Sequence, residues 1–335
     1  QAMPGHMRGS FDMDKEKVFR VVLVAALVFL IYQFGFRPIF NRGSEDINIK
    51  ADRKYWSKLL PDEEGPVYDV IVYGAEPQGI AAAISSARLG ARTLLISEDY
   101  DMGGIITRCL IPELEVPLDS SGKMLNGGFL EELYKKTGDC FSPEEYTEAV
   151  NELIQAESDL SAIAGSVVTG VNMTGRHIDS IEVLTKDGKA DLSARMYIDA
   201  SDSGALLELC KVPYFTGSAD LGLENRFMPV SLNFEMELKA GSAADGKNLA
   251  GRTAVFNDGP VKYEPLNKNI RLEDPRICFL SDGKVIIRGL QVAGVDVLDG
   301  DSMQRAYGTA VEEAKNLSRW LSENYVELKD HVFSK

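Results

Sequence analysis

Histidine is scarce in this 335-residue sequence, which contains three of them. His6 lies in a leading segment typical of a cloning remnant, His177 lies in an expected hairpin turn, and His331 lies near the C-terminal end. A Ser-His-Asp triad or a histidine-rich metal site would have to recruit these residues, and no G-x-S-x-G motif is present. The sequence therefore disfavours hydrolases and metalloenzymes, and we predict no metal site.

Cysteine is also rare, with four residues at positions 109, 140, 210 and 278. They form no CxxC pair and no other metal-ligand spacing, so neither a zinc site nor a disulfide framework is indicated. We expect four buried free thiols.

Basic residues are outnumbered, because 36 Lys and Arg face 51 Asp and Glu and leave a net charge of −15. This balance argues against nucleic acid as a partner. Hydrophobic residues make up 44% of the chain, enough for a large globular core. An anionic cofactor would need local help from backbone N–H groups.

One long apolar run, Val21 to Phe36, is interrupted only by Gln33. Counted from Val18, it approaches the roughly 20 residues that cross a bilayer as a helix. We expect residues 1–17 to be a tag remnant and tail, and residues 18–36 to be a single transmembrane anchor. A cleaved signal peptide and a buried core helix are the alternatives. Basic residues flank both ends, so the positive-inside rule only weakly favours an extracytoplasmic body on the membrane.

A polar linker, residues 37–66, precedes the globular body. Tyr68 to Tyr73 is a short β-branched run that predicts a strand, Ile80 to Leu89 has helical spacing, and Arg92 to Ser97 predicts a second buried strand. These elements form a βαβ unit with two parallel strands. Further strands are expected at Ser166–Asn172, Ile178–Thr185 and Ala194–Asp199.

The segment Gly74-Ala75-Glu76-Pro77-Gln78-Gly79 lies between the first strand and the helix, where a dinucleotide fingerprint must lie. Gly74 permits a tight turn, Gly79 permits close helix packing, and the helix N-terminus offers N–H groups to a pyrophosphate. Glu76 replaces the middle glycine, and its carboxylate would repel a pyrophosphate unless the side chain turns away. The alternative is a βαβ turn without a ligand.

The end of the second strand is where such folds place a ribose acceptor. Glu98 or the Ser97 hydroxyl can accept a hydrogen bond from the ribose. Either residue could equally be a solvated loop residue.

The stretch DVIVYGAEPQGIAAAISSARLGARTLLISEDYDMGGIITRCL resembles the N-terminal signature of the FAD-dependent oxidoreductase family that includes the xanthan-lyase-associated flavoproteins. ARMYIDASDSGALLELCKVPYFTG resembles the second flavin signature of that family, and Ser166-Val167-Val168 matches the strand beside the adenine. The resemblance implies FAD as cofactor. The implied binding residues are Gly74, Glu76, Pro77, Gln78, Gly79, Ser97, Glu98, Gly103, Gly104, Ile105, Val167, Val168, Ala200, Ser201 and Gly204.

The resemblance also implies the architecture, an α/β fold in which a mixed α+β substrate domain is inserted into a Rossmann-like FAD-binding domain. Residues 67–220 would form the FAD-binding domain, residues 221–298 the substrate domain, and residues 299–335 a C-terminal helix that returns to the FAD domain. Family members continue into an arginine-rich segment after such a helix, whereas this sequence stops at Lys335. Either the sequence is truncated or the protein lacks this segment, and in both cases part of the expected flavin pocket would be missing.

The implied activity is hydride transfer between FAD and a small-molecule substrate. The segment after the Gly-Gly pair should run past the flavin, so Arg108 is a candidate for binding an anionic substrate and Cys109 for a thiol near the flavin. A surface salt bridge and a small buried side chain are the respective alternatives. For the whole protein, the alternatives are a catalytically silent membrane-associated scaffold and an NAD-dependent reductase. The oligomeric state is left open.

Overall fold

The computed structural model describes residues 68–223, 226–242, 249–259 and 261–335. The predicted N-terminal tail (1–17), membrane anchor (18–36) and linker (37–66) lie outside these described residues. Among the helices of the described residues, none is both long and apolar enough to span a bilayer.

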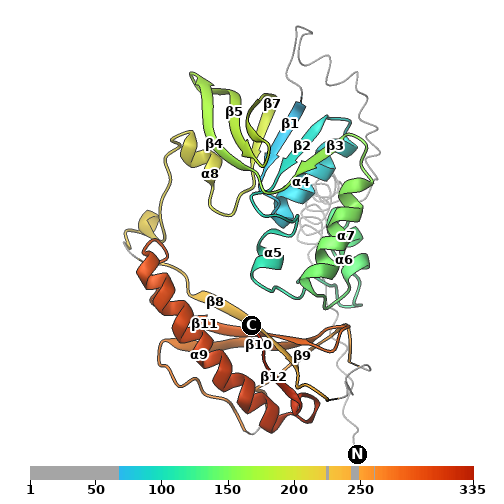
Figure 1. Ribbon diagram of the computed structural model, residues 1–335, viewed down its shortest axis with the longest axis vertical. Coiled ribbons are helices and arrows are strands. Elements are labelled where there is room, and N and C mark those ends of the chain that lie inside the picture. Colours follow the sequence, from blue (N-terminus) through green and yellow to red (C-terminus); the bar gives the residue numbers. More distant parts are fainter. Residues whose placement is uncertain (1–67, 224–225, 243–248, 260) are drawn as a thin grey trace, which may run out of the picture. The chain divides into compact units, whose positions relative to one another are not determined.

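A four-stranded parallel sheet forms the centre of the first lobe (Figure 1). Its strands are β1 (Tyr68–Tyr73), β2 (Thr93–Ile96), β3 (Leu160–Ile163) and β7 (Ala194–Asp199), in the order β3-β2-β1-β7. Helix α4 (Pro77–Arg88) connects β1 to β2, and these two strands pair in parallel, which confirms the predicted βαβ unit. Because all four strands run the same way, their carboxyl ends meet at one edge, where open α/β sheets bind ligands.

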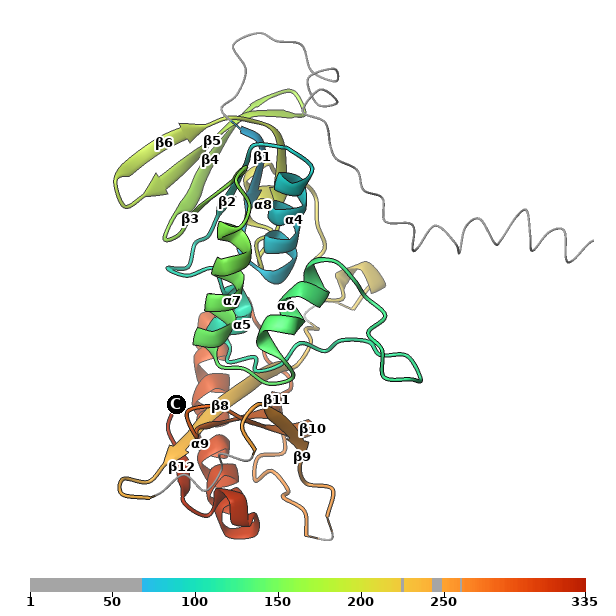
Figure 2. The same cartoon turned by 90° about the vertical axis from the view of Figure 1, so that its right-hand side faces the viewer.

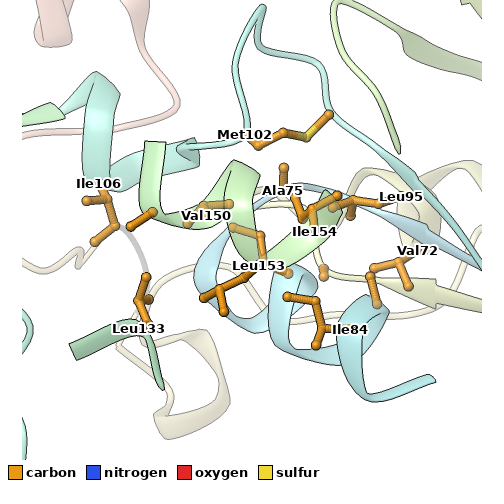
Figure 3. Close-up of a cluster of buried hydrophobic side chains, with 14 of the residues drawn as sticks. Val72, Ala75, Ile84, Leu95, Met102, Ile106, Leu133, Val150, Leu153 and Ile154 are labelled. Atoms are coloured by element: carbon orange, nitrogen blue, oxygen red, sulfur yellow. The ribbon is translucent and has the colours of Figure 1, made fainter. Parts of the chain in front are cut away.

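Both faces of this sheet are covered, since side chains alternate along β1. Val70 and Val72 pack against α4, α6 (Phe129–Thr137) and α7 (Pro143–Gln155), and Figure 3 shows Val72, Ile84, Leu133 and Val150 in this cluster. Ile71 and Tyr73 pack against a three-stranded antiparallel sheet and α8 (Ala205–Leu209) on the other face. That sheet contains β4 (Val167–Thr174), β5 (His177–Thr185) and β6 (Gly188–Leu192), seen in Figure 2.

The second lobe is built on a five-stranded antiparallel sheet in the order β12-β8-β11-β10-β9. Its strands are β8 (Val230–Leu238), β9 (Arg252–Val255), β10 (Ile270–Phe279), β11 (Val285–Val292) and β12 (His331–Phe333), and the short helices η3 (Ala219–Leu221) and η5 (Val326–Leu328) precede β8 and β12.

Helix α9 (Gly300–Asn324) covers the second sheet. Its buried apolar residues recur at helical spacing, so they form one apolar stripe: Ala306, Ala310, Ala314, Leu317 and Leu321. This stripe packs with Phe234, Ile287 and Leu290 of the second sheet. The position differs from the expected return to the first lobe, because the strands that bury the stripe are β8 and β11.

A disulfide joins Cys140, in the loop between α6 and α7, to Cys278 on β10, with a Cα–Cα distance of 5.7 Å and a sequence separation of 138 residues. The prediction of four buried free thiols was therefore wrong. Cys109 and Cys210 are the free cysteines, and they are exposed and half-buried respectively. Sequence spacing gives no sign of a bond between two lobes, because only the fold brings the two sulfur atoms together.

Candidate functional site

Three turns meet at the carboxyl edge of the parallel sheet, after β1, β2 and β7. The Gly74 N–H donates to the Ile96 carbonyl at 2.8 Å, and the Ala200 N–H donates to the Tyr73 carbonyl at 2.8 Å. The structure therefore brings together the two predicted flavin signatures, which are separated by more than a hundred residues in the sequence.

The outer glycines of the first turn have no room for a side chain. Gly74 has a φ of +106°, and a Cβ there would lie 2.4 Å from the Ala200 carbonyl carbon. A Cβ on Gly79 would lie 2.0 Å from the Gly74 carbonyl oxygen. Glycine at these positions permits the tight turn and the close contact of α4 with the sheet, as a dinucleotide-binding turn requires.

No side chain caps the N-terminus of α4. Glu76 is the N-cap residue, but its side chain makes no capping hydrogen bond, and Pro77 at the first helical position has no N–H. The N–H groups of Gln78 and Gly79 cannot have partners within the first helical turn. The exposed Gln78 side chain reaches the Ala200 carbonyl at 3.5 Å. This turn fits the diphosphate of a dinucleotide.

The Glu76 carboxylate is bound to α5 (Gly104–Arg108) rather than to its own helix. The residue is 5% exposed, its Oε2 accepts the Ile105 N–H at 2.7 Å, and its Oε1 accepts from Arg108 Nη2 at 2.8 Å. A Cβ on Gly104 would lie 2.6 Å from Glu76 Oε2, and one on Gly103 would lie 2.0 Å from the Thr107 methyl. Glycines at 103 and 104 therefore make room for these two side chains, and the contact of Gly103 and Gly104 with the cofactor stays a prediction.

Arg108 is the only cation among three carboxylates in this part of the described structure. Its Nη2 lies 2.8 Å from Glu76 and 2.9 Å from Asp202, and its Nε lies 3.3 Å from Asp99. One positive and three negative charges leave a local sum of −2. Burial raises the pKa values of the Glu76 and Asp99 carboxyls, and the nearby Arg108 charge opposes both shifts.

These contacts bear on the predicted roles of Arg108 in substrate binding and of Cys109 as a thiol near the flavin. An anionic substrate would have to compete with carboxylates that already bind the guanidinium. Cys109 is exposed as a whole residue, but desolvation of its sulfur raises the thiol pKa above its ordinary value, with Arg108 opposing the shift. The thiol is therefore protonated at neutral pH and lacks the lowered pKa of a reactive cysteine.

The two candidate ribose acceptors differ in availability. The Ser97 hydroxyl is buried and donates to the Asp101 carbonyl at 2.9 Å, so it holds the loop after β2. Glu98 is exposed, and one of its oxygens accepts the Tyr73 hydroxyl. The other Glu98 oxygen can accept from a ribose hydroxyl.

Tyr73 also ties β4 to this site, because its hydroxyl accepts the Val168 N–H at 3.2 Å. The predicted adenine neighbours Val167 and Val168 therefore lie close to Glu98. The Val167 side chain is 40% exposed, whereas Val168 is buried. An exposed apolar side chain next to the ribose acceptor suits an adenine ring.

The second signature turn is stabilised by Asp199. Its carboxylate accepts the Ser201 hydroxyl at 2.7 Å and the Leu207 N–H at 2.9 Å. Ser201 Oγ in turn accepts the Ala205 N–H at 2.9 Å, and Gly204, with a φ of +68°, precedes α8. The Ser201 side chain thus forms the turn, and the main chain of Ala200 and Ser201 faces Gly74.

Sequence reasoning missed Asp99 and Asp202 as partners of Arg108. Each follows a strand that ends at the carboxyl edge of the parallel sheet. This position in the sequence could have predicted that the two carboxylates lie at the same edge as Arg108. It also missed Glu113, which is 7% exposed and binds Arg276 of β10 at 3.3 Å and Arg288 of β11. With Asn233, whose Nδ2 donates to the Cys109 carbonyl at 2.8 Å, these contacts hold the segment after α5 against the second lobe.

Several solved structures are similar to this chain at low sequence identity. A geranylgeranyl bacteriochlorophyll reductase-like protein from Thermoplasma acidophilum has 14% identity and a TM-score of 0.44, with 80% of this chain and 64% of that chain covered. The p-nitrophenol 4-monooxygenase from Pseudomonas putida DLL-E4 has 11% identity and a TM-score of 0.38, with 74% and 63% covered. This chain thus spans less than two thirds of the length of either. No curated protein matches it.

A family-level match covers most of the chain and both flavin signatures. The sequence model of the family described as FAD dependent oxidoreductase matches residues 69–329, from the second residue of β1 to η5 and the residue after it. The chain belongs to the FAD-dependent oxidoreductase family, and its cofactor is FAD.

Proposed function

We propose that this protein is an FAD-dependent oxidoreductase that transfers a hydride between its flavin and a small-molecule substrate. The observation that carries the proposal is the uncapped N-terminus of α4 at the carboxyl edge of a parallel sheet, where Glu98 follows the neighbouring strand β2. Bound FAD supplies the redox chemistry, because its isoalloxazine ring accepts or donates the hydride.

The residues at this edge suit the adenosine diphosphate half of FAD. The N–H groups of Gln78 and Gly79 would bind the diphosphate, Glu98 would accept from the ribose, and Val167 and Val168 would lie along the adenine. The Glu76 charge does not exclude the cofactor, because the carboxylate is paired with Arg108 and bound to the Ile105 N–H.

The substrate would bind near the segment after α5, where the second lobe contacts the first through Asn233. Binding of an anionic substrate by Arg108 stays a prediction, and it requires that one of the three carboxylates release the guanidinium. Cys109 would hold its proton at neutral pH, so its contribution would be that of a small polar neighbour rather than a nucleophile.

We also propose that the protein is a single-pass membrane protein of the xanthan-lyase-associated branch, with its body outside the cytoplasm. The apolar segment 18–36 supports the anchor. The Cys140–Cys278 disulfide supports an extracytoplasmic body, because such bonds persist mainly in oxidising compartments. Protease protection in closed vesicles tests this topology, and a body protected on the cytoplasmic side would contradict it.

Visible absorption tests the proposed function. The full chain, incubated with FAD and freed of excess cofactor, should retain flavin bands, and a turnover substrate should bleach these bands without oxygen. Addition of NADH to the protein without flavin is the control for a nicotinamide site. A chain that retains no flavin under any condition would instead be a silent scaffold, a reading that the local charge sum of −2 favours.

A further inference from the structure

The diphosphate of FAD brings negative charge to a site that already has an excess of it. Arg108 balances one of the three carboxylates that surround it, Glu76, Asp99 and Asp202. Glu76 is also the N-cap residue of α4, directly before the N–H groups that would bind the diphosphate. Like charges in a partly desolvated site repel one another strongly.

We propose that FAD binding is coupled to the uptake of one proton by the Glu76 carboxylate, which becomes a neutral carboxylic acid. This inference rests on FAD binding at the α4 turn. The proton comes from solvent, and no other bond is made or broken. The neutral acid can keep accepting the Ile105 N–H through its carbonyl oxygen, whereas the charge-assisted bond from Arg108 to the other oxygen is lost and Arg108 keeps Asp99 and Asp202 as partners.

Burial distinguishes Glu76 from its two neighbours. Its side chain is 6% exposed, against 27% for Asp99 and 49% for Asp202. A buried carboxylate is less well solvated, so it gains most from becoming neutral when further negative charge arrives. Asp202 keeps contact with water beside Arg108.

The groups that face Glu76 act in both directions on its pKa. Burial raises this pKa, and the charges of Asp202 and Asp99, from the turns after β7 and β2, raise it further. The Ile105 N–H and the Arg108 charge, both from α5, lower it. Tyr146 of α7 lies within electrostatic range but is neutral, because burial raises its own pKa. A bound diphosphate would raise the pKa of Glu76 further. Proton uptake therefore occurs at pH values between the pKa of Glu76 in the free protein and its pKa in the FAD-bound protein.

Calorimetric titration of the full chain with FAD, in two buffers of different ionisation enthalpy, counts the protons taken up. For the wild type, the binding heat should differ between the two buffers. This difference, divided by the difference in their ionisation enthalpies, should approach one proton per FAD bound. FAD affinity should fall as the pH rises through the interval in which the proton is taken up, by up to tenfold per unit. Glu76→Gln keeps the shape of the side chain, and its binding heat should not depend on the buffer. At pH 8 this variant should bind FAD about tenfold more tightly than the wild type.

Asp202→Asn is the matched control, because it removes a carboxylate from the same guanidinium at an exposed position. This variant should retain the proton uptake. Equal loss of uptake in both variants would overturn the assignment to Glu76, and buffer-independent heat in a wild type that binds FAD would overturn the coupling itself. If none of the three forms binds FAD while all unfold cooperatively, the cofactor site at α4 is wrong and the coupling falls with it.

Discussion

The Cys140–Cys278 disulfide should contribute a large part of the stability of the chain. The bond closes a loop of 138 residues. Closure of a loop of this length removes about 5 kcal/mol of conformational entropy from the unfolded chain, on the polymer estimate for cross-linked loops. Both cysteines are buried, Cys278 at 1% exposure, so a mild reductant should not reach the bond before the protein unfolds. The Cys140→Ser/Cys278→Ser double variant should therefore lose about 5 kcal/mol of unfolding free energy.

Urea unfolding under non-reducing conditions measures this difference. Cys109→Ser/Cys210→Ser is the matched control, because it removes the two free cysteines and should leave the midpoint unchanged. Thiol titration of the unfolded, unreduced wild type should detect two thiols. Four reactive thiols, or equal midpoints for the two double variants, would refute the reasoning.

Three other predictions concern the site. Glu98→Ala should weaken FAD binding about tenfold, because it removes a charged hydrogen-bond acceptor, and it should lower the melting temperature, because the buried Tyr73 hydroxyl loses its acceptor; fluorescence titration measures the affinity, and unchanged affinity would exclude the ribose contact. Gly79→Ala should lower the free energy of unfolding by at least about 3 kcal/mol, because its Cβ would collide with backbone atoms. Gly308→Ala, in an open and exposed turn of α9, should raise the free energy of unfolding by about 1 kcal/mol. Arg108→Ala should cost about 1 kcal/mol at pH 7.5 and less at pH 4. The sign follows because the raised pKa of Glu76 would rise further without the cation, so the share of the cost that comes from this carboxyl is lost as the pH falls and the carboxyl is protonated; equal costs at both pH values in urea unfolding would contradict it.

The first βαβ unit was predictable from the sequence because its signals are local. The β-branched run Tyr68–Tyr73 matched β1 to the residue, whereas the helix begins three residues earlier than predicted. Pro77 explains this difference, because proline is a common first residue of a helix. The sequence prediction had assigned Pro77 to the fingerprint turn and therefore began the helix after it. Local sequence patterns thus predicted the strands and the glycine turn of this unit.

The arrangement around Arg108 could not be read from the sequence, because it depends on three turns that only the parallel sheet brings together. Asp99 and Asp202 are more than a hundred residues apart, and neither lies in a motif that names its partner. The packing of α9 was missed for a related reason. Its apolar stripe shows that one face is buried, but the stripe does not identify the sheet that buries it.

The attachment of Glu113 to Arg276 and Arg288 has a mechanical consequence. A wide hinge opening between the lobes would have to strip a buried carboxylate of both cations, at a cost of several kcal/mol, and would strain the covalent bond between Cys140 and Cys278. Small molecules would then reach the flavin by displacement of loops and side chains rather than by a wide separation of the two lobes.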